Sequence, residues 1–361
     1  MPLDHAVRMF HQQADACAQL GSPLSAALLH RAAEDIAAGG PCADAVAGHQ
    51  DAPGPAAIAL RLLGAVHALV LTGRAPDLAA HYPSAGGTFD PAHPDPAWPA
   101  FRAVVAAHLP EVREWMTRPP QTNEVGRANL LITGLLYALG GADFPVRLYE
   151  LGSSAGLNLL ADRFRIESPD LAYGPADSPV VLLDAWRGAA PGWLHDAPPL
   201  RFAVRQGCDP TPIDPLSPDG ALALRAYVWA DQPARFARLD GALRLAADTP
   251  PRVDPVGAAA FLRDVRPADG ALTVVWHSVM RQYVPKEEWA RVETELARLA
   301  DASTERAPFA HIALEPHRVG EEHRFLLTVR RGAEPRQILA EAVPHGLPAW
   351  TVTEAELGPV G

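Results

Sequence analysis

The pattern of apolar residues changes at Pro145, and this change limits the choice of fold. Upstream, the pattern predicts helices. In the stretch Ser22–Pro41, for example, Ser22 is the expected N-cap, Pro23 is at the first helical position and Gly39 is near the end. Downstream, strand-like runs such as VRLYEL, LRFAVRQG and ALTVVWHSV alternate with helical segments. Strands that alternate with helices predict a mostly parallel sheet in an α/β domain.

We therefore expect two regions along the chain. Residues 1–120 should form a helical N-terminal region that acts as a lid over the site, and residues 121–361 should form the α/β domain. Three further expectations concern that domain. They are a helix from Ala155 to about Arg165, a loop-rich insertion at about residues 166–199, and, near the end, a short helix in RQILAEAV followed by a last strand in AWTVTEAE.

Charge and lysine content argue against several classes of protein. The net charge of −11 would repel a phosphate backbone, so we expect no nucleic-acid partner. Lys286 is the single lysine among 31 lysine and arginine residues, and no phosphate-binding G-x-x-x-x-G-K-[ST] loop occurs. A pyridoxal phosphate enzyme would have to use Lys286, which lies at an expected helix start.

Targeting and cysteine signals are also missing from the sequence. The start MPLDHAVRMFHQQ has no apolar signal region, and the longest apolar run, Ala128–Gly141, is too short to cross a bilayer. Cys17, Cys42 and Cys208 lie far apart and match neither a disulfide framework nor a zinc spacing. We expect a cytoplasmic protein with a small-molecule substrate, no membrane partner and no metal. The oligomeric state does not follow from the sequence.

The stretch Gly152-Ser153-Ser154-Ala155-Gly156 allows two interpretations. It matches G-x-S-x-G, the turn that exposes a nucleophilic serine in α/β-hydrolases, which would make Ser154 the nucleophile. That turn normally follows several strands and an HGGG-type loop, whereas this one follows the first strand and no such loop occurs. Acids and histidines do follow in the order that a triad needs. The hydrolase interpretation therefore stays open.

The second interpretation is a cofactor-binding loop. In an open parallel sheet, a ligand lies outside the carboxyl ends of the strands, against the first strand, its loop and the following helix N-terminus. Gly152 would allow the tight turn and Gly156 the close packing, although Ser154 stands where many such loops have glycine. Glu150 precedes the first glycine by two residues. This arrangement resembles the first motif, E/D-x-G-x-x-x-G, of S-adenosylmethionine-dependent methyltransferases.

Later elements resemble a class I methyltransferase in their order. FAVRQGCDPTPID is similar to the second strand of that fold, and Asp209 at its end would accept hydrogen bonds from ribose hydroxyls. The gap from Gly156 to Asp209 exceeds the usual ~20 residues, and the insertion accounts for the excess. PRVDPVGAAAFLRD is similar to the third strand, and TVVWHSVMRQYVPKEEW to the fourth strand with its functional tip.

Five phrases in order resemble an uncharacterised bacterial family, domain of unknown function 2332. They are PPQTNEVGR, ELGSSAGLNLLADRF, GCDPTPIDP, YVWADQ and VVWHSVMRQY, and the resemblance covers nearly the whole chain. Ser153 and Ala230 stand where we expect alanine and proline. The family is regarded as methyltransferase-like. The resemblance thus implies a Rossmann-like, class I methyltransferase-like α/β fold with a mostly parallel sheet and a helical N-terminal region.

The resemblance also implies roles for individual residues, with S-adenosylmethionine as the cofactor. Arg127, at the start of the helix before the first strand, would bind the methionine carboxylate as a bidentate partner. The full set of expected cofactor-binding residues is Arg127, Glu150, Gly152, Ser153, Ser154, Gly156, Asn158, Asp209 and Ser278.

The expected catalytic residues are His277, at the end of the fourth strand, and Tyr283. His277 could take a proton from the methyl acceptor. The expected substrate pocket adds Asn123, Glu124, Gln282, Glu315 and His317. His311 and Glu315 share a strand face, but residues four apart on a strand lie roughly 13 Å apart, too far for one metal ion.

Methyl transfer from S-adenosylmethionine to a small molecule is thus the main functional hypothesis. A non-catalytic ligand-binding or scaffold protein with the same fold is the first alternative. A serine hydrolase that uses Ser154 is the second. An oxidoreductase that uses nicotinamide cofactors is a poorer fit, because Glu150 and the missing middle glycine depart from its loop.

Overall fold

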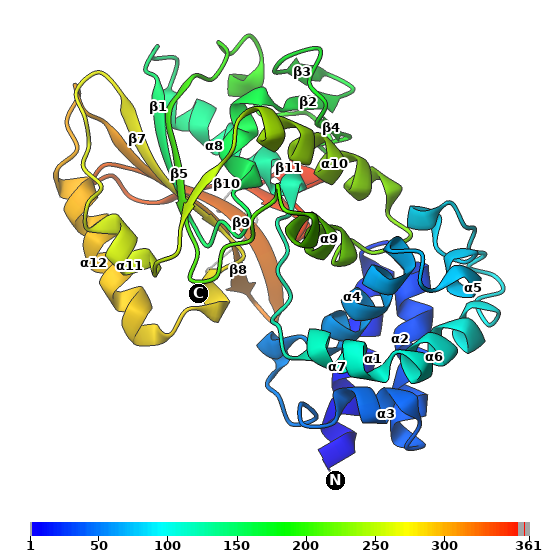
Figure 1. Cartoon of the computed structure of the whole chain (residues 1–361). Coiled ribbons are helices and arrows are strands. Elements are labelled where there is room, and N and C mark those ends of the chain that lie inside the picture. Colours follow the sequence, from blue (N-terminus) through cyan, green and yellow to red (C-terminus); the bar gives the residue numbers. More distant parts are fainter. Residues whose placement is uncertain (1, 353–356, 358–361) are drawn as a thin grey trace. The chain divides into compact units, whose positions relative to one another are not determined.

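The chain forms two compact units (Figure 1). The computed structural model describes residues 2–352 and 357. A helical unit comprises Met1–Thr122 together with Ser217–Ala237, and an α/β unit comprises Asn123–Leu216 together with Arg238–Gly361. The helical unit is therefore built from two stretches of chain, and the second stretch belongs to the part that the sequence pattern assigned to the α/β domain.

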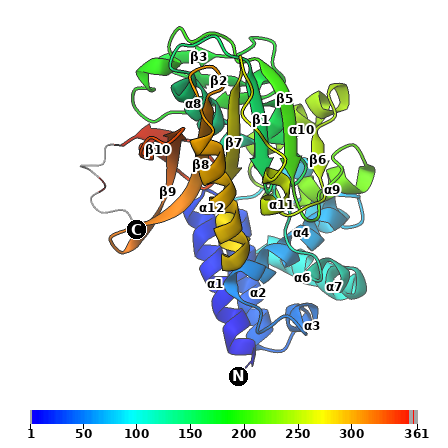
Figure 2. The ribbon, with the colours of Figure 1, turned by 90° about the vertical axis from the view of Figure 1, so that its left-hand side faces the viewer.

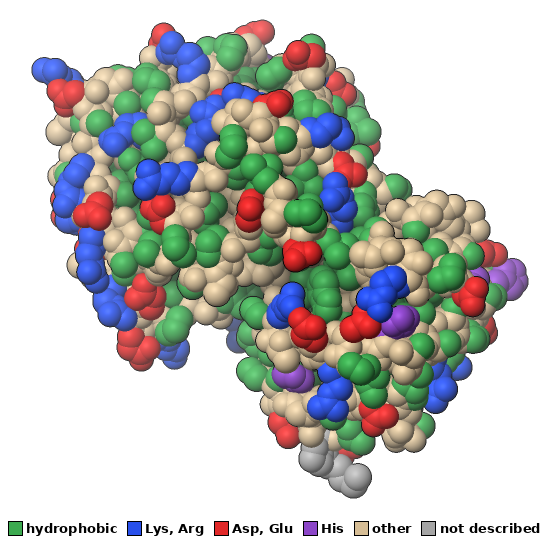
Figure 3. Space-filling view, in the orientation of Figure 1, with side chains coloured by type: hydrophobic (Ala, Val, Ile, Leu, Met, Phe, Trp, Pro, Cys, Tyr) green, Lys and Arg blue, Asp and Glu red, His purple; other side chains and the backbone are tan. Residues whose placement is uncertain are grey.

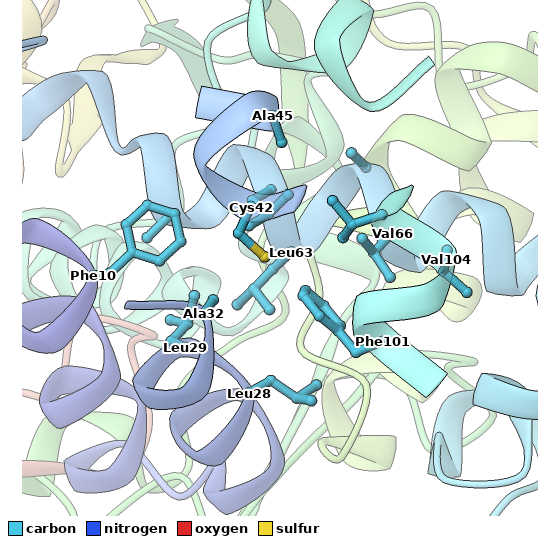
Figure 4. Close-up of a cluster of buried hydrophobic side chains, with 14 of the residues drawn as sticks. Phe10, Leu28, Leu29, Ala32, Cys42, Ala45, Leu63, Val66, Phe101 and Val104 are labelled. Atoms are coloured by element: carbon cyan, nitrogen blue, oxygen red, sulfur yellow. The ribbon is translucent and has the colours of Figure 1, made fainter. Parts of the chain in front are cut away.

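The helical unit packs its helices around one apolar core. Figure 4 shows that core, where Phe10, Leu29, Cys42 and Phe101 meet from four different helices. The helices of this unit are α1 (Pro2–Gln19), α2 (Pro23–Ala37), α3 (Pro41–Val46), α4 (Ile58–Leu71), α5 (Pro76–Ala79), α6 (Ala97–Ala107), α7 (Leu109–Met116) and α9 (Pro218–Ala226), with 3₁₀ turns η1 (Gly54–Ala56) and η2 (Pro83–Ala85). Helix α10 (Pro233–Asp248) begins in this unit and ends in the other.

Helix α4 is the core helix of this unit. It is apolar on nearly all sides, as a helix surrounded by others must be. Among the described residues, Gly54–Leu71 is the one segment whose length and composition would suit a membrane span, and 61 % of it is buried inside the structure. A buried core helix passes the same test, so this segment is weak evidence for a membrane.

The stretch Ser217–Ala237 is joined to the helical unit by specific hydrogen bonds. Asp231 accepts from the Ser22 hydroxyl and, over 2.8 Å, from the backbone N–H of Leu24 at the start of α2. Gln232 donates to the Leu20 carbonyl over 2.8 Å. Ser22 therefore holds the N-cap position as predicted, but its side chain donates to Asp231 and caps no N–H itself. A carboxylate at a helix N-terminus is favourable because the N–H groups there are unpaired and partly positive.

The α/β unit is built on one mixed, eight-stranded sheet in the order β11-β10-β9-β8-β7-β1-β5-β6. Five strands are parallel: β1 (Val146–Leu151), β5 (Phe202–Cys208), β6 (Arg252–Asp254), β7 (Leu272–Ser278) and β8 (Phe309–Val319). Three continue as an antiparallel meander: β9 (Glu322–Arg331), β10 (Gln337–Ala342) and β11 (Ala349–Thr351).

The predicted helix in RQILAEAV is wrong, because this segment forms β10. Its backbone pairs with both β9 and β11, and these tertiary pairings override the local helical pattern. The predicted last strand is β11, and residues 353–356 of that prediction lie outside the described residues.

Helices cover the two faces of this sheet. Helix α8 (Ala128–Leu139) packs so closely on one face that a Cβ on its Gly134 would lie 2.6 Å from Ile312. Helices α11 (Ala258–Leu262) and α12 (Lys286–Asp301) cover the other face, over a core that includes Val275 and Trp289. Figure 2 shows α12 lying along the strands.

The insertion is more regular than predicted. It holds a small sheet of β2 (Arg165–Ser168), β3 (Leu171–Tyr173) and β4 (Val181–Leu183), and the 3₁₀ turn η5 (Gly192–Leu194). The predicted α-helix after the glycine-rich loop is instead the 3₁₀ helix η4 (Leu157–Arg163). Its residues 157–161 are all buried, and β2 starts two residues after its end, which leaves no room for an amphipathic α-helix.

Candidate functional site

The candidate site lies at the carboxyl ends of the central parallel strands. Strand β1 lies between β5 and β7, and the chain continues outward from β1 first to β5 and β6, then to β7 and β8. The loops after β5 and β7 leave this strand on opposite sides, and in open α/β sheets ligands bind at such a position. The loops concerned are Gly152–Gly156 after β1, the segment from Asp209 after β5, and the Ser278–Tyr283 turn, which runs from the end of β7 through η6 (Arg281–Tyr283).

The glycine-rich loop is shaped by close backbone contacts. Gly152 and Gly156 have φ of +66° and +72°, a region that favours glycine. A Cβ on Gly156 would lie 2.7 Å from Val253, and one on Gly152 would lie 3.0 Å from the Cβ of Met280. Ser153 donates to the Cys208 carbonyl through its N–H (3.0 Å) and its hydroxyl (3.2 Å). The loop is therefore fixed against β5 and against the turn after β7.

Asp209 holds this loop from the end of β5. One carboxylate oxygen accepts from the Ser154 N–H over 3.1 Å, and the other accepts from the Thr211 N–H over 2.9 Å. The Asp209 carboxylate, which was expected to bind ribose hydroxyls, thus binds backbone N–H groups of the protein. Each of its oxygens has a second lone pair that could accept a further hydrogen bond.

Glu150 is the centre of a buried polar group on one face of the sheet. It pairs in register with Trp276 on β7, and the Asn158 amide and the Arg127 guanidinium lie near. Burial raises the pKa of Glu150 to about 8, although hydrogen bonds from the Trp276 and Asn158 side chains and the charge of Arg127 act to lower it. Within the described part of the chain, Glu150 Oε2, Trp276 Nε1 and Asn158 Oδ1 are buried without a hydrogen bond of ordinary geometry. Buried polar atoms without well-formed hydrogen bonds are rare in folded proteins, so this loosely bonded group is a candidate position for a ligand.

Residues 123–127, just before α8, form hydrogen bonds with segments that neighbour this polar group. Asn123 Oδ1 accepts from the Leu157 N–H over 2.8 Å, and the Glu124 carbonyl accepts from Asn158 over 3.3 Å. Arg127 donates to the carbonyls of Pro344 (3.0 Å) and Ser278 (3.3 Å). These bonds join η3 (Val125–Arg127) to the loops after β1 and β7.

His277 lies on the opposite face of the sheet from Glu150. It is one residue beyond Trp276 on β7, and successive strand side chains point to opposite faces. Its Nδ1 donates to Glu315 Oε1 over 2.7 Å, and its Nε2 lies 3.0 Å from His311 Nε2. All three residues are buried. The predicted catalytic histidine therefore belongs to a separate buried group, on the α12 side.

Three other predicted residues lie outside both buried groups. Tyr283 is 59 % exposed and Gln282 is exposed on the same turn. His317 is half-buried further along β8, opposite Arg324.

Trp276 and Met280 are site residues that the sequence analysis missed, because strand register and loop contact decide their positions. No group of three or more His, Cys, Asp or Glu side chains in the described residues is arranged to hold a metal ion.

Two surface cavities of the α/β unit lie away from this site. They measure about 650 and 470 Å³ and share Arg331, at the end of β9 beside the amino ends of β7 and β8. On the face drawn in Figure 3, acidic and basic side chains are interspersed. The carboxyl edge is the better candidate because the buried Glu150 carboxyl, with its raised pKa, lies there beside other polar atoms that lack well-formed hydrogen bonds.

Comparison with known proteins places the chain in a family. Residues 7–350 match the model of the family described as "Uncharacterized protein conserved in bacteria (DUF2332)". The chain belongs to this family. No curated protein and no solved structure matches it.

Proposed function

We propose that this DUF2332 member binds S-adenosylmethionine at the carboxyl edge of its parallel strands and transfers the methyl group to a small molecule. The observation that carries the proposal is the buried Glu150 carboxyl, one oxygen of which lacks a hydrogen bond of ordinary geometry. It lies on β1, the strand on either side of which the later parallel strands are added. Burial raises the pKa of this carboxyl, and a positively charged ligand beside it would favour loss of its proton and bind the resulting carboxylate.

The fold and the loop residues fit this cofactor in part. The five parallel strands have the order 3-2-1-4-5 when numbered along the chain, which is the beginning of the doubly wound pattern. Glu150 and Asn158 would face the charged end of the cofactor, Asp209 the ribose and Gly152 the backbone approach. The antiparallel meander, the 3₁₀ helix η4 and the bonds already made by Asp209 depart from a Rossmann-like methyltransferase.

The bound cofactor would supply a methyl group on a positively charged sulfur. The work of the chain's own residues would be to bind, orient and exclude water, which is the main contribution of a protein to an in-line displacement. Arg127 ties the loops after β7 and before β11 to the start of α8 and so would keep the crevice in shape. Exposed Tyr283 and Gln282 are available to contact an acceptor.

Calorimetric titration with S-adenosylmethionine and S-adenosylhomocysteine tests the proposal. We expect micromolar binding to the wild-type protein and its loss in Glu150→Gln, Asp209→Ala and Gly152→Val. Glu341→Gln is the matched control, because Glu341 is also a buried glutamate of this sheet but pairs with Arg324. No binding at millimolar ligand would sink the methyltransferase proposal and favour a non-catalytic ligand-binding or scaffold role.

A serine hydrolase is the second candidate, and one observation favours it. Ser154 has φ of +54°, the kind of strained backbone that a nucleophile turn imposes. Its burial, at 5 % exposure, opposes the idea. A fluorophosphonate probe should label the wild type and Ser153→Ala but not Ser154→Ala if this candidate is correct, and absence of labelling removes it.

A further inference from the structure

A second buried carboxylate, Glu315, has an uneven set of partners. Its Oε1 accepts three N–H groups: His277 Nδ1 at 2.7 Å, and the backbone N–H of Met280 (3.1 Å) and of Arg281 (3.3 Å). Its Oε2 is buried without a partner among the residues that the structure describes. Glu315 therefore joins β8 to the backbone of the Ser278–Tyr283 turn.

His277 connects this carboxylate to a second histidine. Because an ionised carboxylate only accepts, His277 Nδ1 must be the donor. Its Nε2 and His311 Nε2 are 3.0 Å apart, so one of the two must carry a proton and the other must accept it. Burial lowers the pKa of His311 well below its ordinary range, and the charges of His277, Arg336 and Arg330 add to the effect. His311 is therefore the neutral end of a Glu315–His277–His311 chain.

The Ser278–Tyr283 turn that Glu315 holds is strained and lies against the glycine-rich loop. Val279 has φ of +51°, which is an outlier for a β-branched residue. Met280 fills the space beside Gly152, at 3.0 Å from where a Cβ would be. Arg127 donates to the Ser278 carbonyl over 3.3 Å. Any loosening of this turn is thereby transmitted to the loop after β1.

We propose that Glu315 and His311 are positioning residues of the cofactor site, and that through His277 they fix the Ser278–Tyr283 turn against the loop after β1. The expected effect on S-adenosylmethionine binding rests on the proposed function, but the fixing of the turn can be measured without any ligand. In this proposal Glu315, His277 and His311 position the turn and do not contact the methyl acceptor.

The charges around the chain predict how acid affects the turn. Arg330 and Arg336 lie near His311, and Glu293 of α12 lies near Arg336. The guanidinium carbon of Arg281 lies 4.7 Å from the centre of the Trp289 ring. The Trp289 ring in turn contacts the His277 ring edge-on. A proton added to the accepting nitrogen of the Nε2–Nε2 contact would face the charges of Arg330 and Arg336. It would also make both nitrogens donors, which breaks the bond between them. The turn should therefore loosen, and ligand binding should weaken, as the pH falls.

Hydrogen exchange of the Met280 and Arg281 amides tests the proposal directly. We expect Glu315→Gln to accelerate both, after correction for intrinsic rates, by about tenfold, the effect of losing one hydrogen bond to a charged group. His311→Gln should accelerate them less, and it should remove the acceleration that the wild type shows in acid, at pH values well below the ordinary pKa of histidine. The matched control is His67→Gln, which removes a buried, doubly bonded histidine from the helical unit.

Unchanged exchange of both amides in Glu315→Gln and His311→Gln would overturn the proposal, as would an equal acceleration in His67→Gln. If Glu315→Gln does not fold, the pH series on the wild type decides, because exchange that does not accelerate in acid contradicts the proposal. Failure of the wild type to bind S-adenosylmethionine would sink the proposed function alone, since the exchange result is independent of ligand.

Discussion

The two units each bury histidine, and they treat it differently. In the helical unit, His67 bonds through Nδ1 to the Ala226 carbonyl (3.1 Å) and through Nε2 to the Ser84 hydroxyl (2.8 Å), so both ring nitrogens have neutral partners. In the α/β unit, His277 and His311 share a hydrogen-bonded chain with the Glu315 carboxylate. In both Glu315 and Glu150, Oε2 lacks a hydrogen bond of ordinary geometry. A buried polar group whose partners are complete serves packing, whereas groups left incomplete mark the place where another molecule or a proton is expected.

The largest expected effect would come from Glu150. Its pKa of about 8 means that the folded state binds more protons than the unfolded state above about pH 4.5, so stability falls as the pH rises toward 8. Glu150→Gln should therefore stabilise the protein by about 3 kcal/mol at pH 7, and it should also remove the proposed binding of S-adenosylmethionine. Urea unfolding at a series of pH values measures this. If Glu150→Gln is less stable than the wild type at every pH, the Glu150 carboxyl does not destabilise the fold and the contrast with His67 is wrong.

The helical unit should respond to pH in the opposite direction. Burial lowers the pKa of His67 to about 4, so stability is complete above the unfolded value of 6.5 and falls as the pH drops toward 4, by about 3 kcal/mol. Far-UV circular dichroism during urea unfolding follows the helices. His67→Gln should be less stable at neutral pH but should lack this acid slope. An unchanged slope in the variant would assign the acid sensitivity to other groups.

Glycines with positive φ provide a matched pair across the units. Gly156→Ala should destabilise by about 3 kcal/mol, because the new Cβ would lie 2.7 Å from Val253 and 2.9 Å from Pro251 in addition to the backbone strain. Gly73 in the helical unit has φ of +73° with open space around it, so Gly73→Ala should cost about 1 kcal/mol. Thermal unfolding of both variants gives the comparison, and equal losses would show that packing around Gly156 adds nothing.

The smallest effect concerns the cap of α2. Asp231→Asn keeps an acceptor but removes the charge at the helix N-terminus, and should cost about 1 kcal/mol without affecting the α/β unit. Amide exchange in the first turn of α2 measures it. A change in cofactor affinity in this variant would contradict the separation of roles between the two units.

The sequence predicted the local parts of the fold better than the parts that depend on pairing. The strand–loop sequence from Val146 to Gly156 follows from an apolar run and two glycines, and the structure has both. The segment 337–342 was predicted as a helix because its own residues follow a helical pattern, whereas pairing with β9 and β11 makes it a strand. The α/β class could be predicted, while the mixed character of the sheet depends on those same pairings.

The candidate site divides in the same way. Glu150, Asn158, Asn123 and Arg127 do lie near one another, as expected from residues that flank the first strand. His277 was expected to face the methyl acceptor, but it follows Trp276 directly on β7 and therefore lies on the opposite face of the sheet from Glu150. Strand ends can be predicted from sequence, whereas side-chain direction at those ends depends on register that no local pattern fixes.

The helical unit includes Ser217–Ala237, and this has a consequence for synthesis on the ribosome. Helix α2 obtains its carboxylate cap, and His67 its carbonyl partner, only from residues that are translated after β1 and β5. During synthesis, α2 and His67 therefore lack these hydrogen-bond partners until residues 217–237 have left the ribosome. A fragment that ends at Thr122 would lack a structural part, and one that begins at Asn123 would carry a stretch whose proper neighbours are gone.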